Sequence, residues 1–424
     1  MKILFINTYD TDGGAAIAAY RLYRAVKKIG IEADFFCMHK KSDDDKVVTV
    51  DSFIKRAAYR TAFYIERKLL YRRYNSNLNI SKWSFNIVPN FIMPPIENGY
   101  DLVHMHWIGD SFISMRALQK IKIPIIWTLH DSWAFTGGCH LPYDCRGYLK
   151  NCGHCPQLKS GTKNDLSLAI YNSKLGCYSN LKNLKIITPS NWLAGLAKKS
   201  SLFFDKDIKV IGNGVDGEIF KPANKNEVRS RLGLDAGKKL IMFSGIAAIN
   251  NINKGFHFLI ASLKLLYNRF DDIELVVAGD YMPEKTFDFK YKINYIGKIT
   301  DEKIIALYNA AVDVVAVPSM SENLPNTIIE AFASGTPAVA FNVGGISDII
   351  DNKINGCLVK PYDVKEFAEA IAWTLGGNDI KQKLYLNARH KFLEKFDINR
   401  VANLYKESYI TTIAMGKNDL TKYE

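Results

Sequence analysis

The sequence predicts an α/β protein made of two domains in tandem, and three observations lead to this expectation. Apolar runs of strand length alternate with helical patterns along nearly the whole chain, which indicates βαβ units and largely parallel sheets. A polar, charged stretch at residues 217–239 interrupts this alternation, which then starts again. The length of 424 residues also suits two or three domains. Both halves are therefore expected to be Rossmann-like, with a cleft between them as the place for ligands.

The first domain is expected to cover residues 1–216. It opens with the apolar run Lys2 to Ile6, a turn at Asp12-Gly13-Gly14, and a helix whose apolar residues recur at helical spacing. Further strands are expected at residues 31–38, 103–107, 123–129, 184–188 and 208–211. A C-terminal helix at about residues 400–424 is expected to pack back on this domain.

The second domain is expected to cover residues 217–399, with the polar stretch at its start acting as a linker. Its strands are expected at residues 240–245, 273–279, 293–296, 312–317, 337–341 and 356–359. Helical patterns follow Lys254, Asp301, Pro325, Asp363 and Ile380. In open sheets of this kind, ligands bind beyond the carboxyl ends of the strands.

The composition restricts the location and the kind of partner. A net charge of +13 favours an anionic partner, such as nucleic acid, anionic lipid or a phosphorylated small molecule. No apolar stretch reaches the length of about eighteen residues that a transmembrane helix needs, and the N-terminal apolar run is too short for a signal peptide. A cytoplasmic protein is therefore expected, in which the seven cysteines are thiols, metal ligands or reactive groups rather than disulfides.

The loop Asp12-Gly13-Gly14 lies between a strand and a helix, where backbone N–H groups can approach a phosphate. It lacks the full dinucleotide pattern G-x-G-x-x-G. A phosphate-binding loop and a plain tight turn are both open interpretations.

A second motif carries two glutamates. It follows the strand expected at residues 312–317, with Glu322 in a loop, Pro325 suited to the first position of a helix, and Glu330 inside that helix. The free N–H groups of the first helical turn could hold a diphosphate, and the two carboxylates could accept hydrogen bonds from hydroxyl groups on either side of it. The alternative is that Glu322 caps the helix and Glu330 lies on the surface.

Taken together with four further segments, this motif resembles that of a known family. The segments are Asn213-Gly214-Val215-Asp216, Ala278-Gly279-Asp280, Gly335-Thr336-Pro337 and Gly344-Gly345. The chain is similar, over nearly its whole length, to the retaining glycosyltransferases of the double-Rossmann GT-B architecture that carry an E-x7-E motif (glycosyltransferase family 4, or glycosyl transferases group 1). Taken alone, the Gly344-Gly345 turn is either part of the ligand cleft or plain loop geometry.

The resemblance implies roles for individual residues. Glu322 would contact the transferred sugar, and Glu330 would bind the ribose of the donor. The amides of Asn323 and Leu324 would approach the sugar and the phosphates, with Gly14 in the other domain as a further donor-binding position. Lys254 would neutralise the leaving diphosphate, which agrees with the charge that develops there.

His130, which follows a strand, matches a family histidine near the donor sugar, and it would orient a sugar hydroxyl. His104 and His106 alternate along a preceding strand and face the same side, and both are interpreted as structural. One departure stands out: many family members carry an arginine after the glycine that ends the first strand of this domain, whereas here Gly245 is followed by Ile246.

A cysteine-rich loop follows His130. It contains Cys139, Cys145, Cys152 and Cys155, and four thiolates can enclose a tetrahedral zinc ion. A structural zinc is the first interpretation, a set of free or buried thiols the second, and a redox role the third. The loop is similar to one found in a subgroup of these transferases associated with bacterial exopolysaccharide assembly.

The segment at residues 53–74 is basic and aromatic. It holds seven lysines and arginines interleaved with aromatic and aliphatic residues, and helical spacing would give it a cationic face and an aromatic face. An anionic membrane surface is one expected partner. A solvated helix packed by its aromatic side is the equal alternative, and nucleic acid is not expected because no nucleic-acid-binding module is visible.

The resemblance implies a retaining transfer of a hexose from a nucleotide diphosphate sugar to a hydroxyl of a glycan acceptor. It implies no metal at the chemical step and a front-face mechanism, so no protein general base is named. A lipid-linked oligosaccharide at the cytoplasmic face of the membrane is the expected acceptor. Two rivals stay open: a nucleotide-sugar epimerase of the same architecture, and a scaffold subunit without activity.

Overall fold

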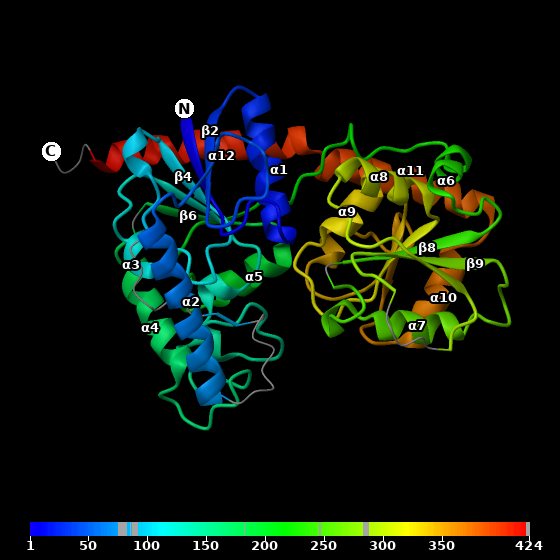
Figure 1. Ribbon diagram of the computed structural model, residues 1–424, viewed down its shortest axis with the longest axis horizontal. Helices are drawn as coiled ribbons and strands as arrows, with labels where there is room; N and C mark the ends of the chain where they lie inside the picture. The colour runs from blue at the N-terminus through cyan, green and yellow to red at the C-terminus, as the bar shows by residue number, and fades with distance from the viewer. Residues whose placement is uncertain are drawn as a thin grey trace. The chain divides into compact units, whose positions relative to one another are not determined.

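The computed structural model of the chain describes residues 1–74, 83–84, 86, 92–181, 183–245, 247–282 and 288–420. It divides into two compact units. The first comprises Met1–Ile211 with Ala402–Glu424, and the second comprises Gly212–Val401. Each unit contains one parallel sheet with helices packed around it (Figure 1). The expected α/β class with two domains is confirmed.

The first unit has a seven-stranded sheet in its described part, with the order β3-β2-β1-β4-β5-β6-β7. The strands are β1 (Lys2–Ile6), β2 (Glu32–Cys37), β3 (Val47–Thr49), β4 (Leu102–Met105), β5 (Ile125–Thr128), β6 (Leu184–Thr188) and β7 (Ile208–Val210). All neighbours pair in parallel. The sequence pattern did not indicate β3, because three residues at the edge of a sheet are too few to show a period.

Helices surround this sheet. They are α1 (Gly14–Lys28), α2 (Phe53–Tyr74), α3 (Met115–Leu118), α4 (Leu166–Tyr178) and α5 (Asn191–Lys199), with short 3-10 turns η2 (Ile96–Asn98), η3 (Trp133–Phe135) and η4 (Gly147–Leu149). Three of them begin at side-chain caps: Ser114 accepts a hydrogen bond from Ala117 N, Asp165 accepts one from Leu168 N, and Ser190 accepts one from Leu193 N. Such caps satisfy N–H groups that have no partner inside the helix.

Among its described residues, the second unit has a six-stranded parallel sheet in the order β10-β9-β8-β11-β12-β13. Its strands are β8 (Lys239–Ser244), β9 (Ile273–Ala278), β10 (Lys292–Tyr295), β11 (Val314–Val317), β12 (Ala338–Phe341) and β13 (Gly356–Val359). Its helices are α6 (Lys225–Leu232), α7 (Phe256–Lys264), α8 (Glu302–Ala311), α9 (Asn326–Ala333), α10 (Val364–Thr374) and α11 (Asn378–Lys395), with the 3-10 turns η5 (Ile252–Lys254) and η6 (Ile346–Asp348).

The polar stretch at residues 217–239 is not an open linker. It contains α6, which is capped by Asn224 and buries Val228 and Arg229 against the second unit. The helix was missed because most of its residues are polar. This helix is anchored by its buried Arg229, which forms an ion pair and hydrogen bonds with residues of the second unit, and not by a stripe of apolar side chains.

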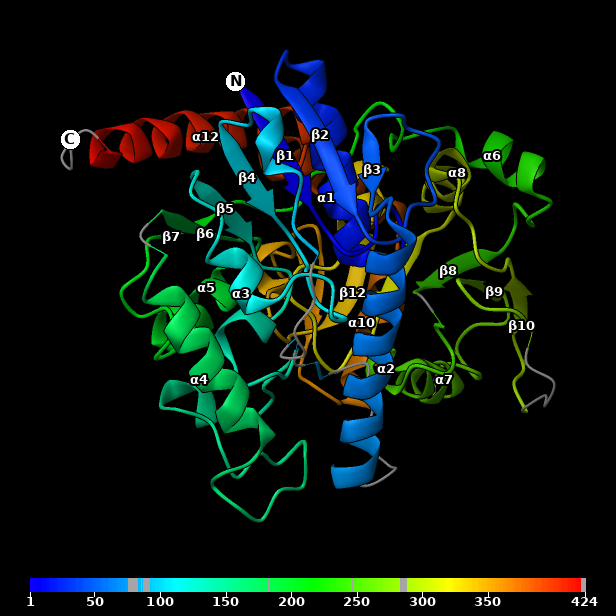
Figure 2. The same cartoon turned by 60° about the vertical axis from the view of Figure 1, so that its left-hand side comes forward.

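The last helix, α12 (Ile398–Leu420), begins in the second unit and continues into the first. Within the first unit it lies along the sheet (Figure 2). Its buried Tyr409 hydroxyl bonds to His104 on β4 at 2.8 Å, and its buried Tyr405 hydroxyl bonds to Thr128 on β5 at 3.0 Å. No helix among the described residues has the length and hydropathy of a membrane span.

Each sheet has one point where the strand order reverses. In the second unit this switch point lies between the adjacent strands β8 and β11, and in the first unit between β1 and β4. Loops that leave neighbouring strands at such a point diverge to opposite faces, which opens a crevice for ligands at the carboxyl edge of the sheet.

Candidate functional site

Lys254 and Glu322 meet at the switch point of the second sheet. Lys254 closes η5, in the segment that follows β8, and Glu322 lies in the loop that follows β11. The Nζ atom of Lys254 is 2.7 Å from Oε1 of Glu322, and the two side chains are 25% and 14% exposed. Two residues that the sequence placed in one site are therefore joined by a half-buried ion pair.

Backbone and amide contacts hold the loop of Glu322. The Nδ2 of Asn253 donates to Ser321 O at 2.9 Å, and the N–H of Met320 donates to Asn253 O at 2.8 Å. Sequence reasoning gave Asn253 no role. Its position next to Lys254 was the only signal, and the structure shows that it couples the two loops.

The helix α9 begins one residue later than expected. Pro325 is its N-cap, with a φ of −68° and a ψ of 118°, rather than its first helical residue. An extended residue at this position ends the loop and opens the helix. Glu330 is half-buried inside α9 and Asn323 is half-buried ahead of it, whereas the side chain of Leu324 is in the core. Only the backbone of Leu324 is therefore suited to contact a ligand.

The segment at Asn213 supports the start of α9. The Nδ2 of Asn213 donates to Asn326 Oδ1 at 2.9 Å and lies 3.3 Å from Leu324 O. The family segment that contains Asn213 therefore supports α9, the helix that carries Glu330, through the side chain of Asn213.

Two glycines allow the loops to approach this closely. A Cβ on Gly255 would lie 1.9 Å from Pro318 O, and one on Gly344 would lie 1.7 Å from Glu322 O; both have positive φ. The N–H of Gly345 also donates to Glu322 O at 3.2 Å. The Gly344-Gly345 turn therefore supports the backbone of Glu322, and a side chain at Gly344 has no room.

Replacing Gly344 with alanine is expected to displace Glu322 and lower turnover about 100-fold, the scale of a misplacement of about 1 Å in a reacting group. The left-handed φ of this residue should also cost about 1–3 kcal/mol of stability. Turnover and thermal melting of the variant would be measured together. Gly377→Ala is the matched control, because its φ is −58° and a Cβ there would meet nothing within 4 Å. Equal turnover of both variants would contradict the role of Gly344.

In the first unit, Gly14 starts α1, which is joined to the carboxyl end of β1 by residues 7–13. A Cβ on Gly13 or on Gly14 would meet no atom within 4 Å, and the φ of Gly13 is +100°. The turn therefore needs glycine at Gly13 for its conformation, while Gly14 leaves open space at the helix N-terminus. Its role in phosphate binding stays a prediction.

His130 is part of a buried group of three histidines. His104 and His106 come from the end of β4, and His130 follows β5. The Nδ1 of His106 lies 2.9 Å from Nε2 of His130. Burial lowers the pKa of His130 to about 4 and the pKa values of His104 and His106 well below their usual range. All three imidazoles are therefore neutral at physiological pH.

Asp131, the next residue, organises the loop after His130. Its carboxylate accepts from Trp133 N at 2.9 Å and from Trp107 Nε1 at 3.1 Å, and it lies 3.2 Å from Nδ1 of His140. No role was predicted for Asp131, although it directly follows the family histidine.

The cysteine-rich loop brings its thiols into one neighbourhood. A Cβ on Gly147 would lie 3.5 Å from Sγ of Cys145 and 4.0 Å from Sγ of Cys152. Burial, with a smaller effect of the neighbouring thiols, raises the pKa of Cys139 to about 12. Cys155 is buried beside the end of α2, and all four cysteines are free thiols.

Protein groups order much of this loop. The ammonium of Lys174 on α4 is fully buried and donates to Trp133 O and to Thr136 O, at 3.0 Å from the latter. Within the part of the chain that the structure describes, no three His, Cys, Asp or Glu side chains are arranged to hold a metal ion. The structural zinc stays a prediction, and metal analysis of the purified protein would test it.

The helix α2 does not separate cationic and aromatic residues into two faces. Its buried side carries Tyr59, Ala62, Glu66, Leu70 and Tyr74. Its exposed side mixes both kinds of residue, with the apolar Phe53, Ile54, Tyr64, Leu69 and Tyr71 and the basic Lys55, Arg56, Arg60, Lys68, Arg72 and Arg73. The expectation of two faces is wrong in this respect, because the tyrosines are divided between the core and the solvent.

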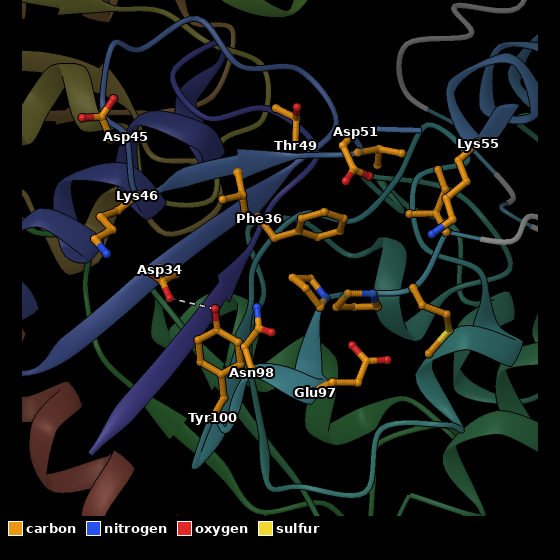
Figure 3. A pocket seen from close by; sticks show the side chains of 16 residues that line it. Asp34, Phe36, Asp45, Lys46, Thr49, Asp51, Lys55, Glu97, Asn98 and Tyr100 are labelled. Atoms are coloured by element: carbon orange, nitrogen blue, oxygen red, sulfur yellow. Dashed lines mark hydrogen bonds between the residues drawn. The ribbon is translucent and has the colours of Figure 1, made fainter. Parts of the chain in front are cut away.

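A cavity of about 520 Å³ lies elsewhere in the first unit (Figure 3). It is lined from β2, β3 and the segment before β4, and Tyr100 donates to Asp34 at its wall with a distance of 2.8 Å. None of the residues expected to bind the donor lines it. Ile246, which replaces the expected arginine, lies outside the described residues.

Comparison with known families covers both units. The family model described as Glycosyltransferase Family 4 matches residues 12–218, and the model described as Glycosyl transferases group 1 matches residues 224–391. Together they extend over the site residues of both halves.

Three similar proteins share the architecture or the sequence. The putative colanic acid biosynthesis glycosyl transferase WcaC of Escherichia coli is 23% identical over 87% of this chain and 90% of its own. The sucrose-phosphate synthase of Thermosynechococcus elongatus has a TM-score of 0.68 at 19% identity, over 98% of this chain and 99% of its own. Anabaena HepE, solved in complex with UDP-glucose, has a TM-score of 0.61 at 18% identity, over 97% and 100% of the two chains.

Proposed function

The chain belongs to the glycosyltransferases that these two family models describe, and from this membership we propose that it transfers a hexose from a nucleoside diphosphate sugar to a hydroxyl group of a glycan, with retention of configuration. The observation that carries the proposal is the ion pair of Lys254 and Glu322 at the switch point of the second sheet. A cation and a carboxylate therefore lie together at the carboxyl edge of the sheet, where open sheets of this kind bind ligands.

The ion pair suits a sugar diphosphate. The ammonium of Lys254 has three N–H donors, and one is directed at Glu322, so that further donors can reach phosphate oxygens. Glu322 can accept from a sugar hydroxyl, and Glu330 from the ribose. The N–H groups of Asn323 and Leu324, together with the first turn of α9, suit the negative charge of the diphosphate. The UDP-glucose bound to HepE supports a donor of this class.

The proposed reaction needs few protein groups. The bond between C1 of the sugar and the leaving phosphate oxygen breaks, and the acceptor oxygen bonds to C1 on the same face. The hydroxyl proton passes to an oxygen of the leaving diphosphate, so the step requires no protein general base. Lys254 stabilises the charge that develops on the leaving group, and His130 orients a sugar hydroxyl.

The proposed acceptor is a lipid-linked glycan in the synthesis of a surface polysaccharide. Two observations support it: the similarity to WcaC, whose name places that protein in colanic acid biosynthesis, and the exposed basic and apolar side of α2. Exposed aromatic and aliphatic groups beside cations suit the interface of an anionic membrane.

A thermal-shift screen with UDP-, GDP- and dTDP-sugars tests the donor. Binding to the native state raises the melting temperature, so one nucleotide series should stabilise the protein and the others should not. The active donor is then incubated alone and followed by NMR. An unchanged sugar agrees with transfer, whereas conversion to an epimer would favour the epimerase, and the absence of any shift would contradict the proposed donor class.

Membrane binding is tested by co-sedimentation of the full-length protein with vesicles. Phosphatidylglycerol vesicles should retain it and phosphatidylcholine vesicles should not, with retention falling as salt rises. The double variant Lys55→Glu/Arg60→Glu should lose binding, because two attractive charges become repulsive. Lys198→Glu/Lys199→Glu on α5, also exposed, is the matched control. Equal loss in both variants would contradict a specific role of α2.

A further inference from the structure

The cavity of about 520 Å³ in the first unit has a size at which proteins bind small organic ligands, about 300–1,000 Å³. It lies beside β2 and β3 at the edge of the sheet. Part of its wall is apolar and includes Phe36, Val48 and Pro95. The side chain of Val48 is 39% exposed, so the wall presents apolar surface to a molecule that enters the cavity.

Charged side chains surround this apolar wall (Figure 3). The exposed ones are Asp45, Lys46, Asp51, Lys55 and Glu97. Within the part of the chain that the structure describes, the charged atoms of these five side chains form no ion pair and no hydrogen bond. They are therefore available to a ligand, in contrast to the carboxylate of Asp34 in the same wall, which accepts from Tyr100 at 2.8 Å.

The two signs of charge in this wall restrict the kind of ligand. Carboxylates and ammonium groups are mixed around the cavity, so neither a compact anion nor a compact cation is complementary to the whole wall. A hydroxyl group can donate to a carboxylate and accept from an ammonium group. A neutral pyranose ring carries several hydroxyl groups, and its C–H groups can contact the apolar part of the wall. The lining therefore suits a neutral sugar residue.

The cavity also reaches the carboxyl edge of the first sheet, where open sheets of this kind bind ligands. Its lining includes Val50 and Asp51, which follow the carboxyl end of β3. The switch point of this sheet lies between β1 and β4, and β3 is two strands away from β1. At the usual strand spacing this separation is about 10 Å. A chain of a few linked sugars can therefore extend from the switch point into the cavity.

We propose that this cavity is a second carbohydrate-binding site, which holds a neutral sugar residue of the acceptor glycan at a distance from the bond that is formed. Asp51 and Glu97 accept hydrogen bonds from hydroxyl groups of this residue, and the apolar wall contacts its ring. The identification of the bound chain as the acceptor rests on the proposed function, whereas the binding of a sugar by the cavity does not.

Saturation-transfer difference NMR of the full-length protein, without any nucleotide, tests the binding. The probes are the methyl glycosides of glucose, galactose, mannose and N-acetylglucosamine, and at least one of them should bind. Asp51→Ala/Glu97→Ala should weaken this binding by about tenfold or more, because hydrogen bonds to two charged groups are lost. Val48→Trp should also weaken it, because the larger side chain fills the cavity.

The matched control is Asp43→Ala/Asp144→Ala. Both carboxylates are exposed in the same unit, neither lines the cavity, and neither forms an ion pair within the described ranges. This variant should bind the probe as the wild type does, and the melting temperatures of all variants would show that the fold is kept. The proposal is overturned if no probe binds, if both cavity variants bind as the wild type does, or if the control loses as much affinity as they do.

Transfer kinetics test the role of the cavity in the reaction. With an oligosaccharide acceptor, Asp51→Ala/Glu97→Ala should raise the KM for the acceptor about tenfold and leave kcat unchanged, because the lost contacts are equal in the ground state and the transition state. With a methyl glycoside as acceptor, which is too short to reach both places, KM should not change. An equal rise with both acceptors would contradict a second site for the chain. If no transfer were found at all, the proposed function would fail, while the NMR result would still decide whether the cavity binds a sugar.

Discussion

Glu322→Ala is expected to reduce sugar transfer by a factor of about 10²–10³, the loss that follows when one preorganised polar group is removed from a reacting centre. The carboxylate is 14% exposed and pairs with Lys254 at 2.7 Å. Its removal takes away the proposed sugar contact and releases the ammonium that the pair holds in place. Initial rates with the identified donor, at saturating and limiting concentrations, would measure the loss in kcat and in kcat/KM.

Three further variants sharpen this prediction. Glu322→Gln keeps an acceptor for Lys254 and should lose less than alanine. Lys254→Ala should lose about as much as Glu322→Ala, and the double variant little more, because residues that act as a unit are not additive. Glu218→Ala, whose side chain is 88% exposed in the same unit, should be unaffected. If Glu322→Ala left transfer and polysaccharide output intact while deletion of the protein abolished that output, the scaffold role would replace the catalytic one.

Asp313→Ala is expected to destabilise the second unit by about 3–5 kcal/mol, the cost of removing one partner from a buried ion pair. Asp313 follows α8 and accepts from Arg229 Nη2 at 2.8 Å, from Lys225 Nζ at 3.2 Å and from Leu240 N at 2.9 Å. The Arg229 side chain is 5% exposed. Without Asp313, the buried Arg229 and the half-buried Lys225 lose their counter-charge.

The same carboxylate predicts a pH dependence. Burial acts to raise the pKa of Asp313, but Lys225 and Arg229 outweigh it and hold that pKa below its usual value. Its stabilising contribution is therefore complete above the unfolded-state pKa of about 4 and disappears as the pH falls through the lower folded-state pKa. The difference in melting temperature between the wild type and Asp313→Ala should be large at pH 7 and should shrink below about pH 4.

Thermal unfolding followed by calorimetry would measure the effect of Asp313. Asp271→Ala is the matched control, because its carboxylate pairs with Lys290 at 2.6 Å but its side chain is 89% exposed, and exposed pairs contribute little. A similar loss of stability in both variants would show that the network around Asp313 contributes no more than an exposed ion pair does. This network also explains α6, whose Arg229 reaches the end of α8 through Ala311 O at 2.8 Å.

Most strands could be predicted because they are buried on both faces and read as continuous apolar runs. Leu184–Thr188 and Gly356–Val359 have the expected bounds, and most of the other strands differ by one or two residues. The elements that were missed carry no such signal. β3 is a three-residue edge strand, and α6 is polar because its burial depends on charge pairs with residues distant in sequence.

The residues of the candidate site also fall into those that could be predicted from the sequence and those that could not. Glu322, Lys254 and His130 could be singled out because the motifs around them resemble those of a known family. The role of Asn253 could not be predicted, since it contacts a residue 68 positions away. His106 was interpreted as structural, and its contact with His130, 24 positions away, was not predicted. The reason for Gly344 was also hidden until its backbone was seen against Glu322 O.

The sequence by itself determined the α/β class and the two domains, because hydrophobic periodicity and turn residues are local properties of the chain. Its motifs indicated the family by their resemblance to those of known members. Only the tertiary structure decided that Lys254 pairs with Glu322, that Asp313 pairs with Arg229 of α6, and that His106 and His130 lie within hydrogen-bonding distance of each other. These are properties of atoms brought within about 3 Å by the strand order, and charge, burial and hydrogen-bond direction act over that distance rather than along the chain.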